Sequence, residues 1–376
     1  MPWEVASVSE IRTAFVHHVR TLKASVAEAC RQFGISRKTG HKWLTRYRHE
    51  PTRPLTDHSR RPHTSPTRTA EAIETTVVAV RDQFGWGPRK IHAYLSAQGQ
   101  ALPSARTVGA ILQRHGRVAP PPADPPAIQR FERAKPNELW QCDFKGYLEV
   151  ARQRVYPFTL LDDHSRYLFT IHPCLDQTMQ TAWDVLWQAF GDFGLPERLL
   201  CDNAFATKQS TPGLSWFDAQ LIRLGIHPSH GRPYHPQTQG KIERFHRTLE
   251  EEVWPRVRRD DLGHFHADVN RWRTTIYNTV RPHESLGDQP PVSRWLPSSR
   301  PRPATLPEVV YPPGALLRKV APSGDIRWQC YRILAGQGLA GQCVRVEERA
   351  DSVALFYAWK EIRCVPTSLL RHRALL

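Results

Sequence analysis

The sequence predicts a multidomain protein with all-α helix-turn-helix modules at its N-terminus, an α/β core and a small C-terminal β-barrel. The chain has 376 residues, and a typical domain size of about 150 residues allows several domains. Proline-rich stretches divide it, because proline neither continues a helix nor donates a backbone hydrogen bond to a sheet. The pieces differ in pattern: two are helical, the third alternates strands and helices, and the last has short strand-like runs.

The composition predicts a DNA-binding protein of a reducing compartment. Lys and Arg number 52 against 36 Asp and Glu, and the net charge of +16 favours a polyanionic partner such as nucleic acid. A basic protein without such a partner is the alternative. The seven cysteines have no C-x-x-C spacing, which argues against a zinc knuckle or a disulfide framework. No signal peptide or membrane span is recognisable, so we expect a cytoplasmic protein without a membrane partner.

Residues 1–50 are predicted to form a helix-turn-helix DNA-binding domain. Ser25 and Glu28 form a capping box that opens one helix, and Gly34 ends it. Ser36 opens a second helix whose outer face is basic. Two short helices joined at a glycine are typical of a helix-turn-helix, although a helical hairpin that packs elsewhere has the same pattern. The expected DNA contacts are Arg37, Lys38 and Lys42.

A linker, 51–66, leads to a second helical module over 67–117. Its three helical segments favour another helix-turn-helix or a winged-helix-like module, and a purely structural helical spacer is the alternative. A second proline-rich linker, 118–134, follows the module. Arg89 and Lys90 are the expected DNA contacts here.

Residues 135–298 are predicted to form the α/β core. Strand patterns come first, in "ELWQCDFKGYLEV", "VYPFTLLDDHSR" and "YLFTIHPCL", and strands then alternate with helices. This order predicts a mixed sheet whose first three strands form an antiparallel meander. The last piece, 308–370, contains short β-rich runs separated by Gly, Pro and Asp, which predict a small antiparallel barrel.

Three acidic residues of the core occupy positions where catalytic ligands gather. Asp143 lies inside an apolar strand, where a carboxylate is costly to bury unless it is paired or binds a cation. Asp202 follows a strand, at the end where loops collect ligands. Glu243 lies beside the apolar stripe of the last helix. Together they would hold one or two divalent cations, with magnesium favoured, and two such ions support phosphodiester cleavage or transfer.

Neighbouring polar residues have ordinary interpretations. Asp162 and Asp163 follow the second strand and are expected to form a turn with Ser165 rather than to bind a metal. The run Glu250–Glu252 is typical of a solvated helix face, and its last two members are expected to point outward. His246 is expected to be a phosphate contact or a structural hydrogen-bonding residue.

The run "LWQCDFKG … FTLLDDHSRY … CDNA … LGI … YHPQTQGKIERFHRTL … YNTVRPHESLG" closely resembles the integrase core of bacterial insertion-sequence transposases, the group related to retroviral integrases. The resemblance implies a ribonuclease H-like fold. It also implies an Asp-Asp-Glu (DDE) triad at Asp143, Asp202 and Glu243 that binds two Mg²⁺ or Mn²⁺ ions. Two departures are a longer spacing between the last two acids and Ala204 in place of the usual glycine. No structural zinc is expected.

The resemblance further implies that the protein is a bacterial DNA transposase that associates with the nucleoid. Such an enzyme binds terminal inverted repeats, cleaves the element ends to free 3′-hydroxyl groups and joins them to target DNA. Its partners would be double-stranded DNA and at least one further copy of the chain. Lys241, Arg244 and Arg247 share a helix with Glu243 and would contact the DNA, and a surface ion pair with that glutamate or Glu250 is the alternative. The other functional interpretations are a repressor or inactive derivative, and a metal-dependent nuclease without strand transfer.

Overall fold

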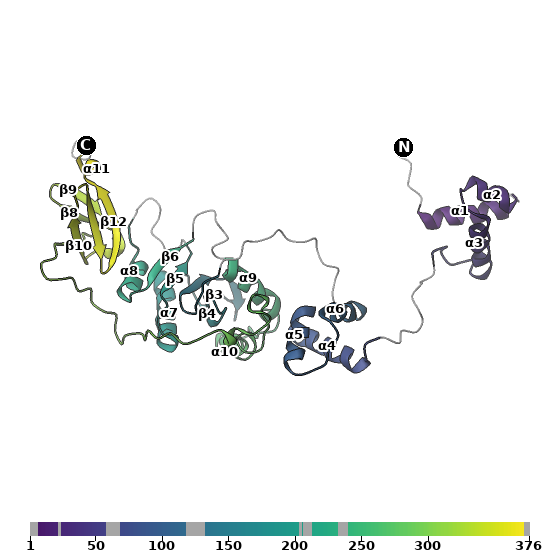
Figure 1. Cartoon of the computed structure of the whole chain (residues 1–376), viewed down its shortest axis with the longest axis horizontal. Helices are drawn as coiled ribbons and strands as arrows, with labels where there is room; N and C mark the ends of the chain where they lie inside the picture. The colour runs from purple at the N-terminus through teal and green to yellow at the C-terminus, as the bar shows by residue number, and fades with distance from the viewer. Residues whose placement is uncertain are drawn as a thin grey trace. The chain divides into compact units, whose positions relative to one another are not determined.

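The computed structural model describes residues 7–21, 24–57, 68–117, 132–202, 205, 213–231 and 240–371. The chain divides into two compact units, Met1–Arg68 and Thr69–Leu376 (Figure 1). No helix in these described ranges is long and apolar enough to cross a membrane.

In the described part of the first unit, three helices pack around one apolar core: α1 (Val8–Thr21), α2 (Val26–Gln32) and α3 (Arg37–His49). The predicted caps are present at Ser25 and Ser36, whose side chains accept backbone hydrogen bonds in the first turns of α2 and α3. Gly40 allows α3 to approach its neighbours closely, since a Cβ there would be 2.5 Å from the Cys30 sulfur. The helix-turn-helix arrangement predicted for this region is thus formed.

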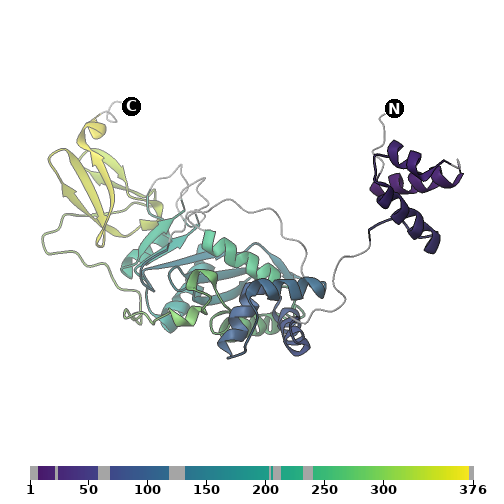
Figure 2. The ribbon, with the colours of Figure 1, turned by 45° about the vertical axis from the view of Figure 1, so that its right-hand side comes forward.

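The second unit begins with the helices α4 (Glu71–Phe84), α5 (Pro88–Ala97) and α6 (Ala105–Arg114), drawn in blue in Figures 1 and 2. Gly85 ends α4 in the left-handed conformation at φ 76°, and Pro88 occupies the first turn of α5, where its missing N–H costs nothing. Ile276 and Val280 from a later segment pack against the apolar core of this module. The module is therefore attached to the rest of the second unit.

The described part of the core contains one mixed sheet. Its strands are β1 (Leu139–Phe144), β2 (Leu148–Val150), β3 (Gln153–Asp162), β4 (Leu168–Cys174), β5 (Arg198–Cys201) and β6 (His227–His230). They run in the order β2-β3-β1-β5-β6, with β4 also paired to β3. Strand β3 is antiparallel to β1 and β4, which confirms the predicted meander, and β5 is parallel to β1 and β6.

Helices cover both faces of this sheet. Phe158 and Leu160 of β3 belong to the apolar cluster that includes α7 (Met179–Phe193) and α8 (Trp216–Arg223). The neighbouring Leu161 belongs to a different cluster on the opposite face, because successive side chains of a strand alternate. That cluster includes α9 (Gly240–Thr248), the π-helical turn η3 (Leu249–Val253), α10 (Leu262–Trp272) and a second π-helical turn, η4 (Arg273–Tyr277). Short 3₁₀ turns η5 (Glu284–Leu286) and η6 (Pro291–Ser293) follow.

The closed C-terminal barrel is not confirmed, because the described strands form two separate sheets (Figure 2). The backbone that follows the two-stranded sheet pairs elsewhere: Leu214 N–H donates to the Ala335 carbonyl and Gly338 N–H donates to the Leu214 carbonyl, each at 3.2 Å. A Cβ on Gly336 would collide with the Leu214 backbone.

The four-stranded sheet, ordered β12-β11-β10-β7, comprises β7 (Leu317–Lys319), β10 (Cys343–Glu348), β11 (Ser352–Tyr357) and β12 (Lys360–Pro366). The two-stranded sheet comprises β8 (Asp325–Trp328) and β9 (Tyr331–Leu334), and α11 (Thr367–Arg371) follows β12.

We predict that His283 makes the fold acid-sensitive. Burial lowers the pKa of His283 well below its usual value, and the positive charges of Arg281 and Lys90 lower it further. The unfolded chain therefore binds a proton near pH 6.5 that the folded chain does not, so stability falls as the pH falls below that value. Between pH 7.5 and 5.5 this one ring should therefore lower the unfolding free energy by an amount on the order of 1 kcal/mol.

Urea unfolding of the wild type and of His283→Gln at the two pH values measures this cost. The variant should lose less unfolding free energy than the wild type, by an amount on the order of 1 kcal/mol. Equal losses in both proteins would contradict the prediction.

Candidate active site

Asp143 and Asp202 lie at the carboxyl ends of neighbouring parallel strands. Asp143 is in β1, Asp202 directly follows β5, and the two strands pair with each other. The residues that precede these acids, Cys142 and Cys201, are buried with their sulfur atoms 3.1 Å apart. Because strand side chains alternate between faces, the Asp143 carboxylate is directed to the face opposite the two sulfurs.

The Asp143 carboxylate interacts electrostatically with the other two acids. Burial raises the pKa of Asp143 to about 7, and the negative charges of Asp202 and Glu243 raise it as well. Like charges shift a pKa in this way when they are near. The structure thus brings the three predicted acids into one region.

Among the residues that the structure describes, no three Asp, Glu, His or Cys side chains are grouped closely enough to hold a metal ion. The donor chemistry nevertheless suits a hard cation, because Asp143, Asp202 and Glu243 offer only carboxylate oxygens. The pKa of Asp143 is raised by burial and then by the negative charges of its neighbours. A bound cation would offset this repulsion between the carboxylates.

Helix α9, which carries Glu243, is held on the sheet by a buried ion pair. Lys241 Nζ is 2.5 Å from Asp163 Oδ1, and that aspartate is fully buried. Gln141 Nε2 of β1 donates to the same carboxylate oxygen at 2.6 Å. Lys241, predicted to contact DNA, is therefore engaged within the chain, whereas Arg244 and Arg247 of the same helix are exposed.

His246 provides a second link between α9 and the sheet. Its Nε2 is 2.9 Å from the Thr159 hydroxyl, which also donates to the backbone carbonyl of Asp143 at 3.0 Å. Burial, and then the charge of Lys145, lowers the pKa of His246 to about 4. The ring is neutral at pH 7, so its Nδ1, 3.8 Å from Asp143 Oδ2, forms no ion pair there. This is the structural hydrogen-bonding role that was one of its two predicted roles.

The predicted turn after β3 is confirmed at Asp162. Asp162 Oδ2 accepts hydrogen bonds from the backbone N–H and the hydroxyl of Ser165, at 2.7 and 2.6 Å. Its Oδ1 accepts from the backbone N–H of Asn137 at 2.8 Å. Asp163 instead faces Lys241, so protein donors occupy both carboxylates of this pair.

The prediction that Glu252 points outward is wrong. Glu252 is 7% exposed and accepts hydrogen bonds from Trp86 Nε1 and Lys90 Nζ, each at 3.1 Å, and from Arg281 Nη2 and Nε at 2.8 and 2.9 Å. Glu252 follows Leu249 by three residues and Phe245 by seven, so helical periodicity places it beside the buried apolar stripe of this segment. Its carboxylate is buried there because cationic and indole donors of the same chain pair with it.

The remaining predicted DNA contacts differ in their surroundings. On α3, Arg37 and Lys38 are exposed, while Lys42 is exposed and lies 3.1 Å from Asp57 Oδ1. In the second module, Lys90 pairs with the buried glutamate of η3, and Arg89 pairs with both Glu284 and Asp288, at 2.9 and 3.0 Å. Arg89 and Lys90 thus bind acids of their own chain.

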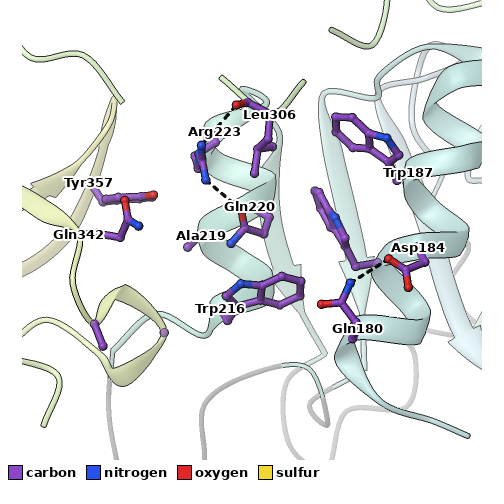
Figure 3. A pocket seen from close by; sticks show the side chains of 13 residues that line it. Gln180, Asp184, Trp187, Trp216, Ala219, Gln220, Arg223, Leu306, Gln342 and Tyr357 are labelled. Atoms are coloured by element: carbon purple, nitrogen blue, oxygen red, sulfur yellow. Dashed lines mark hydrogen bonds between the residues drawn. The ribbon is translucent and has the colours of Figure 1, made fainter. Parts of the chain in front are cut away.

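A cavity of about 530 Å³ lies between α7, α8 and the C-terminal strands (Figure 3). Trp187 and Trp216 line it together with Tyr357, and Gln180 Nε2 donates to Asp184 Oδ1 at 2.8 Å on its α7 side. None of the predicted site residues lines this cavity.

We predict that Lys241→Met lowers the unfolding free energy by about 3 kcal/mol, because it leaves the Asp163 carboxylate buried without its cation. The matched change Arg247→Met, at an exposed position of the same helix, should change stability by no more than about 0.5 kcal/mol. Urea unfolding of both variants beside the wild type measures the difference. Equally small effects would show that the ion pair does not hold α9.

The chain matches known domain families over most of its described length. An integrase core domain matches residues 133–236, and a further integrase core domain match covers 224–291. A helix-turn-helix domain matches residues 14–63, and a homeodomain-like domain matches 39–112.

Two curated relatives illustrate the range of similar proteins. The putative transposase for insertion sequence element IS5376 of Geobacillus stearothermophilus is 25% identical over 242 residues, which are 60% of this chain and 58% of that protein. The Gag-Pro-Pol polyprotein of sheep pulmonary adenomatosis virus is 27% identical over 130 residues, or 34% of this chain and 7% of the polyprotein. The chain thus spans less than two thirds of either relative.

Solved structures with a similar chain include a simian T-cell lymphotropic virus intasome, at 16% identity and a TM-score of 0.34 over 77% of this chain and 96% of that one. Another is the HTLV-2 integrase catalytic core domain in complex with magnesium, at 16% identity and a TM-score of 0.31 over 43% of this chain and 97% of that one. This chain therefore contains segments that match integrase core and helix-turn-helix domains, and it is similar in sequence to an insertion-sequence transposase.

Proposed function

We propose that this protein is a DNA transposase of the DDE class. It binds the terminal inverted repeats of an insertion sequence, cleaves at the element ends to free 3′-hydroxyl groups and joins these to target DNA. The observation that carries the proposal is the group of acids in the integrase core: the pKa of Asp143 is raised by burial and by the charges of Asp202 and Glu243. The helix-turn-helix domain match supports DNA as the substrate.

Asp143, Asp202 and Glu243 are the proposed ligands of two Mg²⁺ or Mn²⁺ ions. Carboxylate oxygens are the ligands that both ions prefer, and a cation among three acids offsets their mutual repulsion. When bound, such a pair of ions stabilises the charge on the attacking and leaving oxygens of a phosphoryl transfer.

The chain's own residues hold these acids in place. Asp143 is fixed by the pairing of β1 with β3 and β5, and Glu243 by the contacts of α9 with Asp163 and Thr159. Positioning of this kind allows a reacting phosphate to be aligned without further movement of the protein. The exposed Arg244 and Arg247 lie next to Glu243 in sequence and on its helix, where they would neutralise DNA phosphates.

In the first unit, α3 is the second helix of the helix-turn-helix, the element that such domains insert into the major groove. Its exposed basic residues are the proposed contacts with the terminal repeats, and they are Arg37, Lys38 and Lys42. Joining two element ends in one reaction requires two active sites, so the active form is proposed to contain at least two copies of the chain.

Two other activities share parts of this architecture. A repressor, or an inactive derivative, would bind the repeats without cutting them, and a nuclease would cut without joining. The matched helix-turn-helix domain argues against a nuclease of RNA hybrids, which needs no reader of DNA sequence. A strand-transfer assay with paired ends and Mg²⁺ distinguishes the three: joined products support the transposase, cleavage alone the nuclease and binding alone the repressor.

We predict that Asp143→Asn abolishes cleavage and leaves DNA binding within about twofold, because the amide keeps the shape of the side chain but loses the charge that holds the cation. The measurement uses a labelled duplex of the sequence that flanks the coding region, with Mg²⁺ for cleavage and a mobility shift for binding. Asp192→Asn, at an exposed position of α7, is the control and should behave as the wild type. A large loss of binding would instead give Asp143 a structural role.

We predict that Lys38→Ala weakens binding to the same duplex and reduces the slope of log K against log salt by about one unit, because one phosphate contact is lost. Binding isotherms at several salt concentrations give the slope. If the slope stays at the wild-type value, Lys38 does not contact a phosphate.

A further inference from the structure

A buried carboxylate joins the second helical module to the core. Glu252 lies in η3, and its donors come from two different segments: Trp86 and Lys90 at the start of the α5 region, and Arg281 after η4. Arg256 Nη1 also donates to the Glu252 backbone carbonyl at 2.8 Å. Glu252 of the core thus accepts hydrogen bonds both from the α4–α6 module and from the core itself.

Apolar packing and outer ion pairs surround this carboxylate. Trp86 is 1% exposed and stacks on Phe84, with 4.2 Å between ring centroids. Ile276 and Val280 of the core segment pack against the same cluster. At the exposed edge, Arg89 pairs with two acids of the turn around η5. Surrounding contacts of this kind exclude water from the buried residues at the centre of an interface.

The charges at this centre depend on one another. Burial alone would raise the pKa of Glu252, but hydrogen bonds and charge from Arg281, with a further contribution from Lys90, lower it below its usual value. Arg281 is itself only 6% exposed. Removing one member of such a buried set leaves another charge unpaired, so the contact is strongly weakened by a single substitution.

The same helical segment carries the proposed catalytic glutamate. Glu243 lies in the first turn of α9, and η3 follows α9 without a break. At a rise of about 1.5 Å per residue, Glu252 is roughly 13 Å further along this segment. The segment therefore connects the active-site face at one end with the second module at the other.

We propose that Glu252 is a positioning residue that fixes the α4–α6 module on the core, and thereby fixes where DNA bound by that module is cut. This inference rests on the proposed function. It also changes which residues of the module are expected to meet DNA, because Arg89 and Lys90 pair with acids of their own chain. The exposed Arg106 of α6 takes their place as the expected contact.

The first test needs neither DNA nor metal. Hydrogen exchange of the full chain is compared for the wild type, Glu252→Gln and Glu251→Gln, since Glu251 is exposed in the same turn. In Glu252→Gln the amides of α5 should exchange at least tenfold faster, while those of β3 keep the wild-type rate. Glu251→Gln should match the wild type throughout. Trp86→Phe, which removes the indole N–H donor together with one of the two fused rings, should change α5 in the same direction and serves if Glu252→Gln does not fold.

The second test separates positioning from stability. The labelled duplex of the flanking sequence is cut in the presence of Mg²⁺, and the cut positions are mapped at nucleotide resolution. Glu252→Gln should bind within about threefold of the wild type but cut at several neighbouring bonds, whereas a protein that is merely less stable cuts the same bond less often.

Wild-type exchange of α5 in both Glu252→Gln and Trp86→Phe would overturn the proposal, as would an unchanged single cut position in Glu252→Gln. A wild-type protein that cuts no DNA would contradict the proposed function instead, and the exchange measurement would still decide whether Glu252 holds the module.

Discussion

The burial of the Asp143 carboxylate near the ends of β1 and β5 is the feature on which the candidate site of the core depends. The pKa of Asp143 is raised by burial and by the charges of Asp202 and Glu243, so contact among the three acids is not favourable by itself. The contacts that surround the three acids must therefore hold them in position. Backbone pairing fixes the first acid, and the Lys241–Asp163 ion pair fixes the helix that carries the last. Preorganisation by such surrounding contacts is what a site that binds cations and phosphates requires.

The sheet and the helix caps were predictable because local patterns determine them. Apolar strands in the order of a meander, and serine caps at Ser25 and Ser36, need no knowledge of distant contacts. The predicted closed barrel was not found, since its closure depends on partners elsewhere in the chain. There the backbone beside Gly336 pairs with Leu214, a residue more than one hundred positions away in the sequence, and hairpin β8–β9 remains a separate sheet.

Asp143 could be singled out because an aspartate in an apolar strand is unusual, whereas the full set with Asp202 and Glu243 depended on the resemblance to integrase cores. In the structure the charges of Asp202 and Glu243 both act on Asp143. Individual charged partners could not be predicted from composition. Lys241, Arg89 and Lys90 have the same charge as the exposed Arg244, and only the fold shows that the first three face acids of their own chain. The orientation of Glu252 was missed for a different reason. Its spacing of three residues from Leu249 and seven from Phe245 is that of a buried position, but three consecutive glutamates are typical of a solvated face, and the paired donors come from distant segments.

Exposed cations remain on both elements to which the proposed function assigns DNA contacts, α3 and α9. The net charge of +16 is too large for internal pairing alone, yet many basic residues of the second module and of α9 are used inside the chain. Among the described residues, the exposed basic side chains include Arg37 and Lys38 on α3 and Arg244 and Arg247 on α9. Phosphate contacts position a duplex, and base contacts specify it. If base and phosphate contacts are divided in this way, α3 would select the DNA sequence. Helix α9 would hold the DNA backbone beside Glu243, one of the proposed metal ligands.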